Sequence, residues 1–260
     1  MSPADSSPSP SILPLLLFYG GVLGLAAVAV AVLLSLFTPI PLWVVLILGI
    51  LGAVGYTVVR FNNVDQIVLD HLDVVDADEK IHARIFNLLE SLSLSSGVPS
   101  PDLYLTDDPS VNAAAVQRGT DAAAVVTAGA VTHLDRLELE GLLAEVIIRI
   151  ANGDARASTV SAAMIGLPFS TGPLSFLSPL AHKVMTAVLV PDRELIGDVA
   201  SVRLTRYPQA LANVLERSTG LIDTPPTQSD AGSAHLWVVP PSPYHGRYDA
   251  AVRIAALNEF

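Results

Sequence analysis

Residues 12–59 read ILPLLLFYGGVLGLAAVAVAVLLSLFTPIPLWVVLILGILGAVGYTVV, a stretch without a single charged side chain. A membrane-spanning helix needs about 20 apolar residues to cross a hydrocarbon core roughly 30 Å thick. Ile12 to Phe37 and Ile40 to Val59 each meet this length, and together they are too long for one crossing. The break at Thr38-Pro39-Ile40-Pro41 ends the first helix, because proline disrupts a helix and restrains the residue before it. The stretch therefore predicts a transmembrane helical hairpin.

The composition of the whole chain also indicates a membrane protein. Hydrophobic residues make up 51% of the 260 residues and charged residues only 15%, against about 25% charged residues in a typical soluble domain. The net charge of −11 argues against a nucleic-acid partner, since a phosphate backbone needs a basic surface. Cysteine is absent, which excludes disulfides and thiolate metal sites. We predict no cofactor.

The distribution of basic residues predicts which side of the membrane the rest of the chain occupies. A hairpin returns the chain to the side where it started. The turn between the two helices carries no Lys or Arg, whereas Arg60 and Lys80 follow the second helix. By the positive-inside rule, the domain after the hairpin is expected to be cytoplasmic. Residues 1–11 are rich in Ser and Pro and are expected to be disordered.

Residues 64–260 have the mixed pattern of an α+β domain in which helices dominate. Short apolar runs at 103–105, 112–116 and 122–127 predict strands of a small β-sheet. A helix is expected to begin near Asp135, with a buried stripe that runs from Leu139 to Ile150. Residues 157–181 carry no charge but contain three prolines, too many for a regular membrane helix. This segment is either an interfacial or re-entrant hairpin beside the anchor or a buried loop.

Several short strings, in a shared order, resemble the HtpX-like family of membrane zinc metalloproteases, which are related to the prenyl-protein (CAAX) proteases. The likeness covers roughly residues 75 to 257, and the helical hairpin also fits. The strings are Asn112–Ala115 (an edge strand along the substrate groove), Ala123–Gly129, Leu137–Ala144 (the run into H-E-x-x-H), Asn152–Asp154, Arg193–Asp198 (R-E-x-x-A-D) and Val252–Leu257 (the closing helix). The resemblance implies a zincin-like fold in a bacterial-type inner or plasma membrane.

The resemblance also implies where the metal-binding motif should lie, and different residues stand there. The first histidine falls on Glu145, the catalytic glutamate on Val146 and the second histidine on Arg149. A zincin needs two imidazoles one helical turn apart and a glutamate to take a proton from zinc-bound water. Arginine has no lone pair to offer and carries a permanent positive charge. We therefore expect no metal site and a chain that is not an enzyme, a pseudoprotease.

The replacements suggest what fills the space. Glu145 and Arg149 are four residues apart on a helix, and the resemblance brings Glu194 and Asp198 beside them. The sequence favours a buried cluster in which the Arg149 guanidinium bridges Glu145 and Glu194, because its planar fork suits carboxylates. The alternative is an exposed Glu145–Arg149 pair of little energetic consequence.

These features predict a scaffold, adaptor or accessory subunit of a membrane protein complex. The expected docking element is the strand Asn112, Ala113, Ala114, Ala115 and Val116, since an exposed strand can pair with an extended peptide. Its partners would be the membrane and other membrane-protein subunits. The alternative is an active membrane metallohydrolase whose atypical carboxylate metal site uses Glu145, Glu194 and Asp198. A third reading is a domain that only supports the hairpin.

Overall fold

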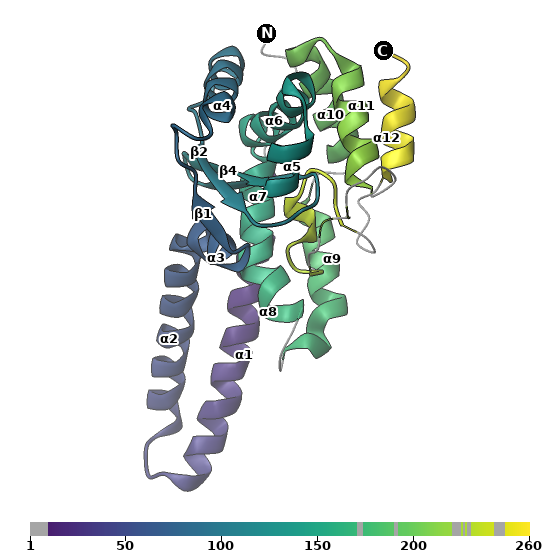
Figure 1. Ribbon diagram of the computed structural model, residues 1–260. Helices are drawn as coiled ribbons and strands as arrows, with labels where there is room; N and C mark the ends of the chain where they lie inside the picture. Colours follow the sequence, from purple (N-terminus) through teal and green to yellow (C-terminus); the bar gives the residue numbers. More distant parts are fainter. Residues whose placement is uncertain are drawn as a thin grey trace.

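The computed structural model describes residues 10–170, 174–189, 192–219, 225, 227, 230–241 and 248–260. Two long helices, α1 (Leu13–Phe37) and α2 (Leu42–Asn62), form a hairpin that projects from a head built by the remaining elements (Figure 1). Most of the N-terminal segment expected to be disordered, residues 1–9, lies outside the described residues.

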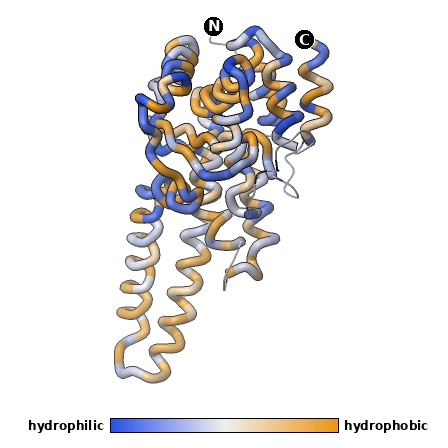
Figure 2. Tube along the Cα trace, viewed as in Figure 1, coloured by the Kyte–Doolittle hydropathy of each residue, from blue (hydrophilic) through white to orange (hydrophobic). Residues whose placement is uncertain are grey.

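The hairpin is apolar along its whole length, as Figure 2 shows in orange. Both helices are long and apolar enough to cross a membrane, and very few of their residues are buried inside the protein. Their close approach is clearest at Gly49, where a Cβ atom would lie 3.2 Å from the Cβ of Ala27. Small residues at such points let two helices pack tightly in lipid. The predicted transmembrane hairpin is therefore confirmed.

A four-stranded mixed sheet lies at the centre of the head. Its strands are β1 (Val74–Asp76), β2 (Asp102–Thr106), β3 (Ala113–Arg118) and β4 (Asp121–Thr127). The order is β1-β2-β4-β3, in which β2 and β4 are parallel and the other two pairs antiparallel. β3 and β4 form a hairpin whose turn includes Gly119 at φ 62°. β1 and β3 are therefore the two edge strands.

Helices cover both faces of this sheet. Those of the head are α3 (Val64–His71), α4 (Ala83–Ser96), α5 (Ala128–His133), α6 (Arg136–Ala151), α7 (Asp154–Ser161), α8 (Leu167–Ser170), α9 (Ser178–Val188), α10 (Arg193–Thr205), α11 (Pro208–Ser218) and α12 (Ala250–Leu257). Short turns of other helix types are η2 (Ala162–Gly166), η3 (Ser175–Leu177) and η4 (Ala234–Leu236). The predicted α+β class, with a small sheet among dominant helices, is confirmed.

Side chains of β3 and β4 alternate between two apolar clusters, because successive residues of a strand point to opposite faces. One cluster, under α4, α6 and α11, takes Ala113, Ala115, Ala124 and Val126. The other, toward the hairpin and the η2–α9 segment, takes Ala114, Val116, Ala123 and Val125. The sheet is thus buried on both sides and joins the head to its anchor.

The junction between anchor and head is held by polar and aromatic contacts. Arg60, in the last turn of α2, donates from Nε and Nη2 to the carbonyl oxygen of Ala163 at 3.0 and 2.7 Å. Its guanidinium also lies 5.7 Å from the ring centroid of Tyr19 in α1. Phe169 of α8 packs against Phe18, with ring centroids 5.5 Å apart. The η2–α9 segment is therefore attached to the first turns of α1.

Candidate functional site

The site predicted from the sequence lies on α6, which begins with a reciprocal cap. Asp135 Oδ1 accepts a hydrogen bond from the Glu138 amide at 2.9 Å, and Glu138 Oε2 accepts one from the Asp135 amide at 3.1 Å. This capping box satisfies amides that the first turn leaves without partners. From that start, the helix runs through the centre of the head. Val146 packs in the apolar cluster under the sheet.

Glu145 and Arg149 form an ion pair inside the head. Arg149 Nε lies 3.3 Å from Glu145 Oε1, and the two side chains are 4% and 0% exposed. The remaining donors of the guanidinium reach main-chain carbonyls: Nη1 donates to Leu236 and Trp237 at 3.3 and 3.0 Å, and Nη2 to Val238 at 3.3 Å. The alternative of an exposed pair is therefore wrong.

The predicted bridge from Arg149 to Glu194 is also wrong. Glu194, in the first turn of α10, is buried but pairs with Arg193 Nε at 3.4 Å. Asp198, one turn further on, receives two hydrogen bonds from Arg253 of α12, at 2.8 and 2.6 Å. The other donors of Arg149 reach carbonyls instead of Glu194, and each of the three carboxylates is paired with a different arginine.

Burial controls the charge state of this cluster. Desolvation raises the pKa of Glu145 to about 7, the nearby Asp198 carboxylate adds to the rise, and Arg149 offsets only part of it. Within the described part of the chain, Glu145 Oε2 has no hydrogen-bond partner. Burial lowers the pKa of His235 to about 4, with help from the Arg193 guanidinium. His235 is therefore neutral at pH 7, and its Nε2 donates to the Ser158 carbonyl at 3.0 Å.

The residues present do not fit the zinc ion that the resemblance implies. Arg149 stands where the resemblance would place a histidine ligand. It is a cation, and its donors are directed at carbonyls and at the Glu145 carboxylate. The carboxylates of Glu145, Glu194 and Asp198 are each paired with a guanidinium, which leaves no open set of oxygen ligands. In the residues that the structure describes, no group of three or more His, Asp or Glu side chains is placed to hold a metal.

The edge strand predicted as a docking element is buried and already paired. Trp237 bridges Ala114 in antiparallel fashion, and the Val238 amide donates to the Ala113 carbonyl at 2.8 Å. Asn112 extends this pairing with its side chain: Nδ2 donates to the Val239 carbonyl at 2.7 Å, and Oδ1 accepts from the Val239 amide at 3.1 Å. The sequence had suggested an exposed strand, whereas this strand is buried.

Sequence analysis missed three contributors to the site. Arg253 anchors Asp198, Gly197 provides room for Glu145, and residues 236–238 accept hydrogen bonds from Arg149. The apolar run at His235–Val239 was a signal for the last of these. An extended segment there is a natural partner for an edge strand, but sequence spacing alone does not say which edge it meets.

One relative decides the family. A protein from Dictyoglomus thermophilum, described as "Protease HtpX homolog", is 31% identical over 208 residues, which cover 70% of this chain and 68% of the relative. The chain belongs to the HtpX protease family. HtpX homologues from Dictyoglomus turgidum and an Arthrobacter species are 29% and 27% identical, over 75% and 85% of this chain and 75% and 82% of their own. No family model matches the chain, and no solved structure does.

Membership of the HtpX family overturns one expectation. The replaced motif residues had suggested a chain that is not an enzyme, whereas the relatives are named as proteases and so point to a protease. That expectation rested on three positions of one helix, whereas the likeness extends over most of the chain. The molecule is an integral membrane protein of metalloprotease-like character.

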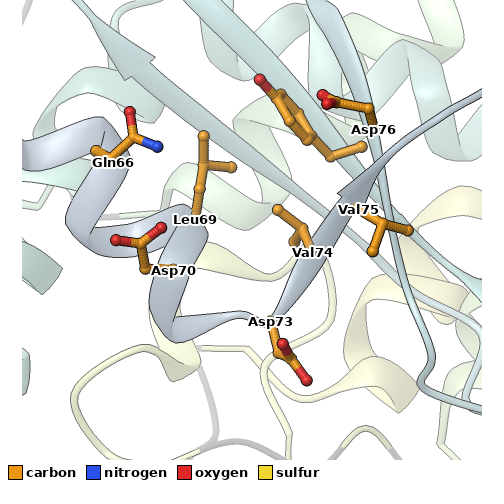
Figure 3. Close-up of a pocket in the computed structure, with 8 residues that line it drawn as sticks. Gln66, Leu69, Asp70, Asp73, Val74, Val75 and Asp76 are labelled. Carbon is orange, nitrogen blue, oxygen red and sulfur yellow. The ribbon is translucent and has the colours of Figure 1, made fainter.

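A separate cavity of about 590 Å³ lies at the opposite edge of the sheet, between α3 and β1 (Figure 3). Asp70, Asp73 and Asp76 come from α3, the turn after it and β1, and all three are exposed. Since β1 and β3 are opposite edges, this acidic cavity is not part of the site on α6.

Proposed function

We propose that this HtpX-family protein is a scaffold or accessory subunit of a membrane protein complex, and that its head binds an extended segment of a partner along the outer edge of β3. One observation carries the proposal: this edge holds the main chain of an extended segment, as the contacts of Val238 and Val239 demonstrate. The partner is expected to be a membrane protein, since the hairpin keeps the head at the bilayer surface.

The contacts available at the edge are directed at main-chain groups. The Ala113 carbonyl accepts a hydrogen bond from a main-chain amide, and the Asn112 side chain both donates to and accepts from the main chain of one residue. Arg149 donates to consecutive carbonyls. Recognition of this kind depends on an extended backbone more than on particular side chains. Attachment of both proteins to one membrane also raises their effective concentration, so a short segment suffices.

We infer further that the head lies in the cytoplasm beneath a bacterial-type inner or plasma membrane. The hairpin tip, residues 38–41, carries no basic residue, whereas Arg60 lies in the last turn of α2, next to the head. This asymmetry follows the positive-inside rule.

The η2–α9 segment is inferred to enter the membrane interface beside α1. Phe176 and Leu180 are exposed although both are apolar, and α9 lies alongside the head-proximal part of α1 (Figure 1). Exposed apolar side chains at the level of the anchor are stabilised by lipid rather than by water.

The scaffold proposal is tested by extracting the full-length protein from its native membrane in mild detergent and measuring the mass of the particle. We expect a complex with a second membrane protein, and we expect that complex to be lost when residues 64–260 are removed. A lone monomer under several detergent conditions would overturn the proposal. A complex that persists with residues 1–63 alone would assign assembly to the hairpin instead.

Proteolysis is the second candidate, and the names of the relatives favour it. The measurement is cleavage of casein by the purified full-length protein, with and without a chelator. Activity that disappears in Glu194→Gln and survives in the control Glu90→Gln, an exposed glutamate on α4, would assign cleavage to this site. Cleavage that both variants retain would come from a contaminant.

A further inference from the structure

Residues 234–239 lie where a bound peptide would lie. Its first half is the short turn η4, which lies beside α7. Its second half, from Trp237 on, runs antiparallel to β3, with contacts at Ala113 and Ala114. Further along the same edge, the Gln117 amide donates to Thr159 Oγ1 of α7 at 2.9 Å. The outer edge of β3 is therefore covered by the chain itself at both ends.

Two buried arginines hold the carbonyl groups of this segment. Arg149 reaches it from α6, as described above, and Arg253 reaches it from α12. The Val238 carbonyl accepts from both, at 3.3 Å from Arg149 Nη2 and 2.9 Å from Arg253 Nη1. Arg193 adds a hydrogen bond to the His235 carbonyl at 2.8 Å. Guanidiniums from three helices thus bind four consecutive carbonyls, and none of these contacts depends on the side chains of the segment.

The segment does not satisfy all of its hydrogen-bonding groups at this edge. Its pairing with β3 is a single isolated bridge and not a ladder. Two buried polar atoms of the segment, Trp237 Nε1 and His235 Nδ1, have no hydrogen-bond partner in the described part of the chain. A buried donor without an acceptor disfavours the state that contains it. A segment with fully paired polar groups would fit this edge better.

We propose that residues 234–239 are an intramolecular occupant of the β3 edge, which must leave before the extended segment of a partner can pair there. The inference rests on the proposed function, since it takes the edge to be the binding site. The same main-chain contacts cannot serve two strands at once, so the seated segment acts as a built-in competitor. Binding at the edge is then coupled to release of the segment.

Release of the segment can be measured without any partner. Hydrogen exchange of the full-length protein in detergent reports how often the Val238 and Val239 amides lose their acceptors. We expect them to exchange faster than the β4 amides of Val125 and Val126 by roughly a factor of ten or more, because β4 is paired on both sides. Equal protection of the two segments would overturn the inference.

A reversible lock tests competition. Residues directly opposite in an antiparallel pair have Cα atoms about 4.5–5.5 Å apart, within reach of a disulfide. The double variant Ala114→Cys/Trp237→Cys therefore locks the segment when oxidised and frees it when reduced, and the chain has no cysteine of its own to interfere. Each single-cysteine variant is the matched control.

The probe is a fluorescent peptide with the sequence SAHLWVVP, residues 233–240. We expect the reduced double variant to bind it and the oxidised form to bind at least about ten-fold more weakly, a difference of about 1.4 kcal/mol. Equal binding to both forms would overturn the inference. If the segment exchanges rapidly but neither form binds the peptide, the segment is released as inferred. That result would overturn the proposed function instead.

Discussion

The carboxylate of Glu145 occupies the space in which a side chain at position 197 would lie. A Cβ atom at Gly197 would collide with both carboxylate oxygens of Glu145. The R-E-x-x-A-D pattern that this segment resembles has alanine at that position. Helices α6 and α10 are therefore fitted to each other at these two residues, and the buried acid of one helix requires the glycine of the other.

This fit predicts that Gly197→Ala destabilises the protein. The added methyl must displace a fully buried carboxylate, and overpacking of this kind typically costs about 1–3 kcal/mol. Thermal unfolding of the full-length protein in detergent measures the loss. Gly24→Ala is the control, since nothing lies within 4 Å of a Cβ at Gly24.

The same contact predicts a rescue. In the double variant Gly197→Ala/Glu145→Ala the collision is absent, so the two effects are expected to be strongly non-additive. Additive losses of stability would show that Glu145 and Gly197 do not interact as described.

Arg149→Ala is expected to destabilise the protein by about 3–5 kcal/mol, because it leaves Glu145 buried without its ion-pair partner. The carbonyls of residues 236–238 also lose a donor. Chemical denaturation measures the change. Arg118→Ala is the control: Arg118 pairs with Asp65 at the surface, and its loss should change stability little, because solvent screens an exposed ion pair. Equal effects of the two variants would contradict the buried cluster.

Glu145 should make stability depend on pH in a definite direction. Its pKa is about 7 in the folded protein, above its ordinary value of 4.5. The folded state thus holds the proton more tightly than the unfolded state. The stabilisation that protonated Glu145 provides is fully present below pH 4.5. It is lost as the pH rises through 7, which lowers the free energy of unfolding by up to about 3 kcal/mol.

The measurement is the stability difference between the wild type and Glu145→Gln at each pH from 4.5 to 8. The stability of the variant relative to that of the wild type is expected to increase as the pH rises. Comparison at each pH removes the opposite contribution of His235, whose folded-state pKa of about 4 makes stability fall as the pH drops. A difference that does not change with pH would contradict the assignment.

Membrane contact of the η2–α9 segment predicts slow labelling of a cysteine there. Phe176 is 74% exposed and Leu94, on the outer face of α4, is 76% exposed. In proteoliposomes, Phe176→Cys is expected to react with a water-soluble maleimide much more slowly than Leu94→Cys, because lipid covers it. Similar rates would place the segment in water.

If the head is cytoplasmic, a cysteine on it should be protected from an impermeant reagent in intact cells. An impermeant maleimide added outside should label Thr38→Cys, at the hairpin tip, and should label Leu94→Cys only after the cells are opened. The reverse pattern would place the head on the outer side. The absence of native cysteine makes both variants free of background.

The membrane hairpin, the small sheet and the position of α6 could be predicted from the chain alone. Each depends on local chemistry: uninterrupted apolar length, the alternation of β3 and β4, and the capping residues Asp135 and Glu138. The register of the motif stays a prediction: it rests on the strings on both sides, which place Glu145 and Arg149 where the two histidines would stand.

Tertiary structure alone decided the partners of the buried charges. Arg149 lies near Glu145 by helical spacing, yet its other donors meet carbonyls 87 to 89 residues further along the chain, and Asp198 pairs with an arginine 55 residues away. Spacing within one helix sets which side chains are neighbours. The choice among distant acceptors depends on how helices and loops pack, because burial requires each charge to take whatever polar group the packing brings within reach.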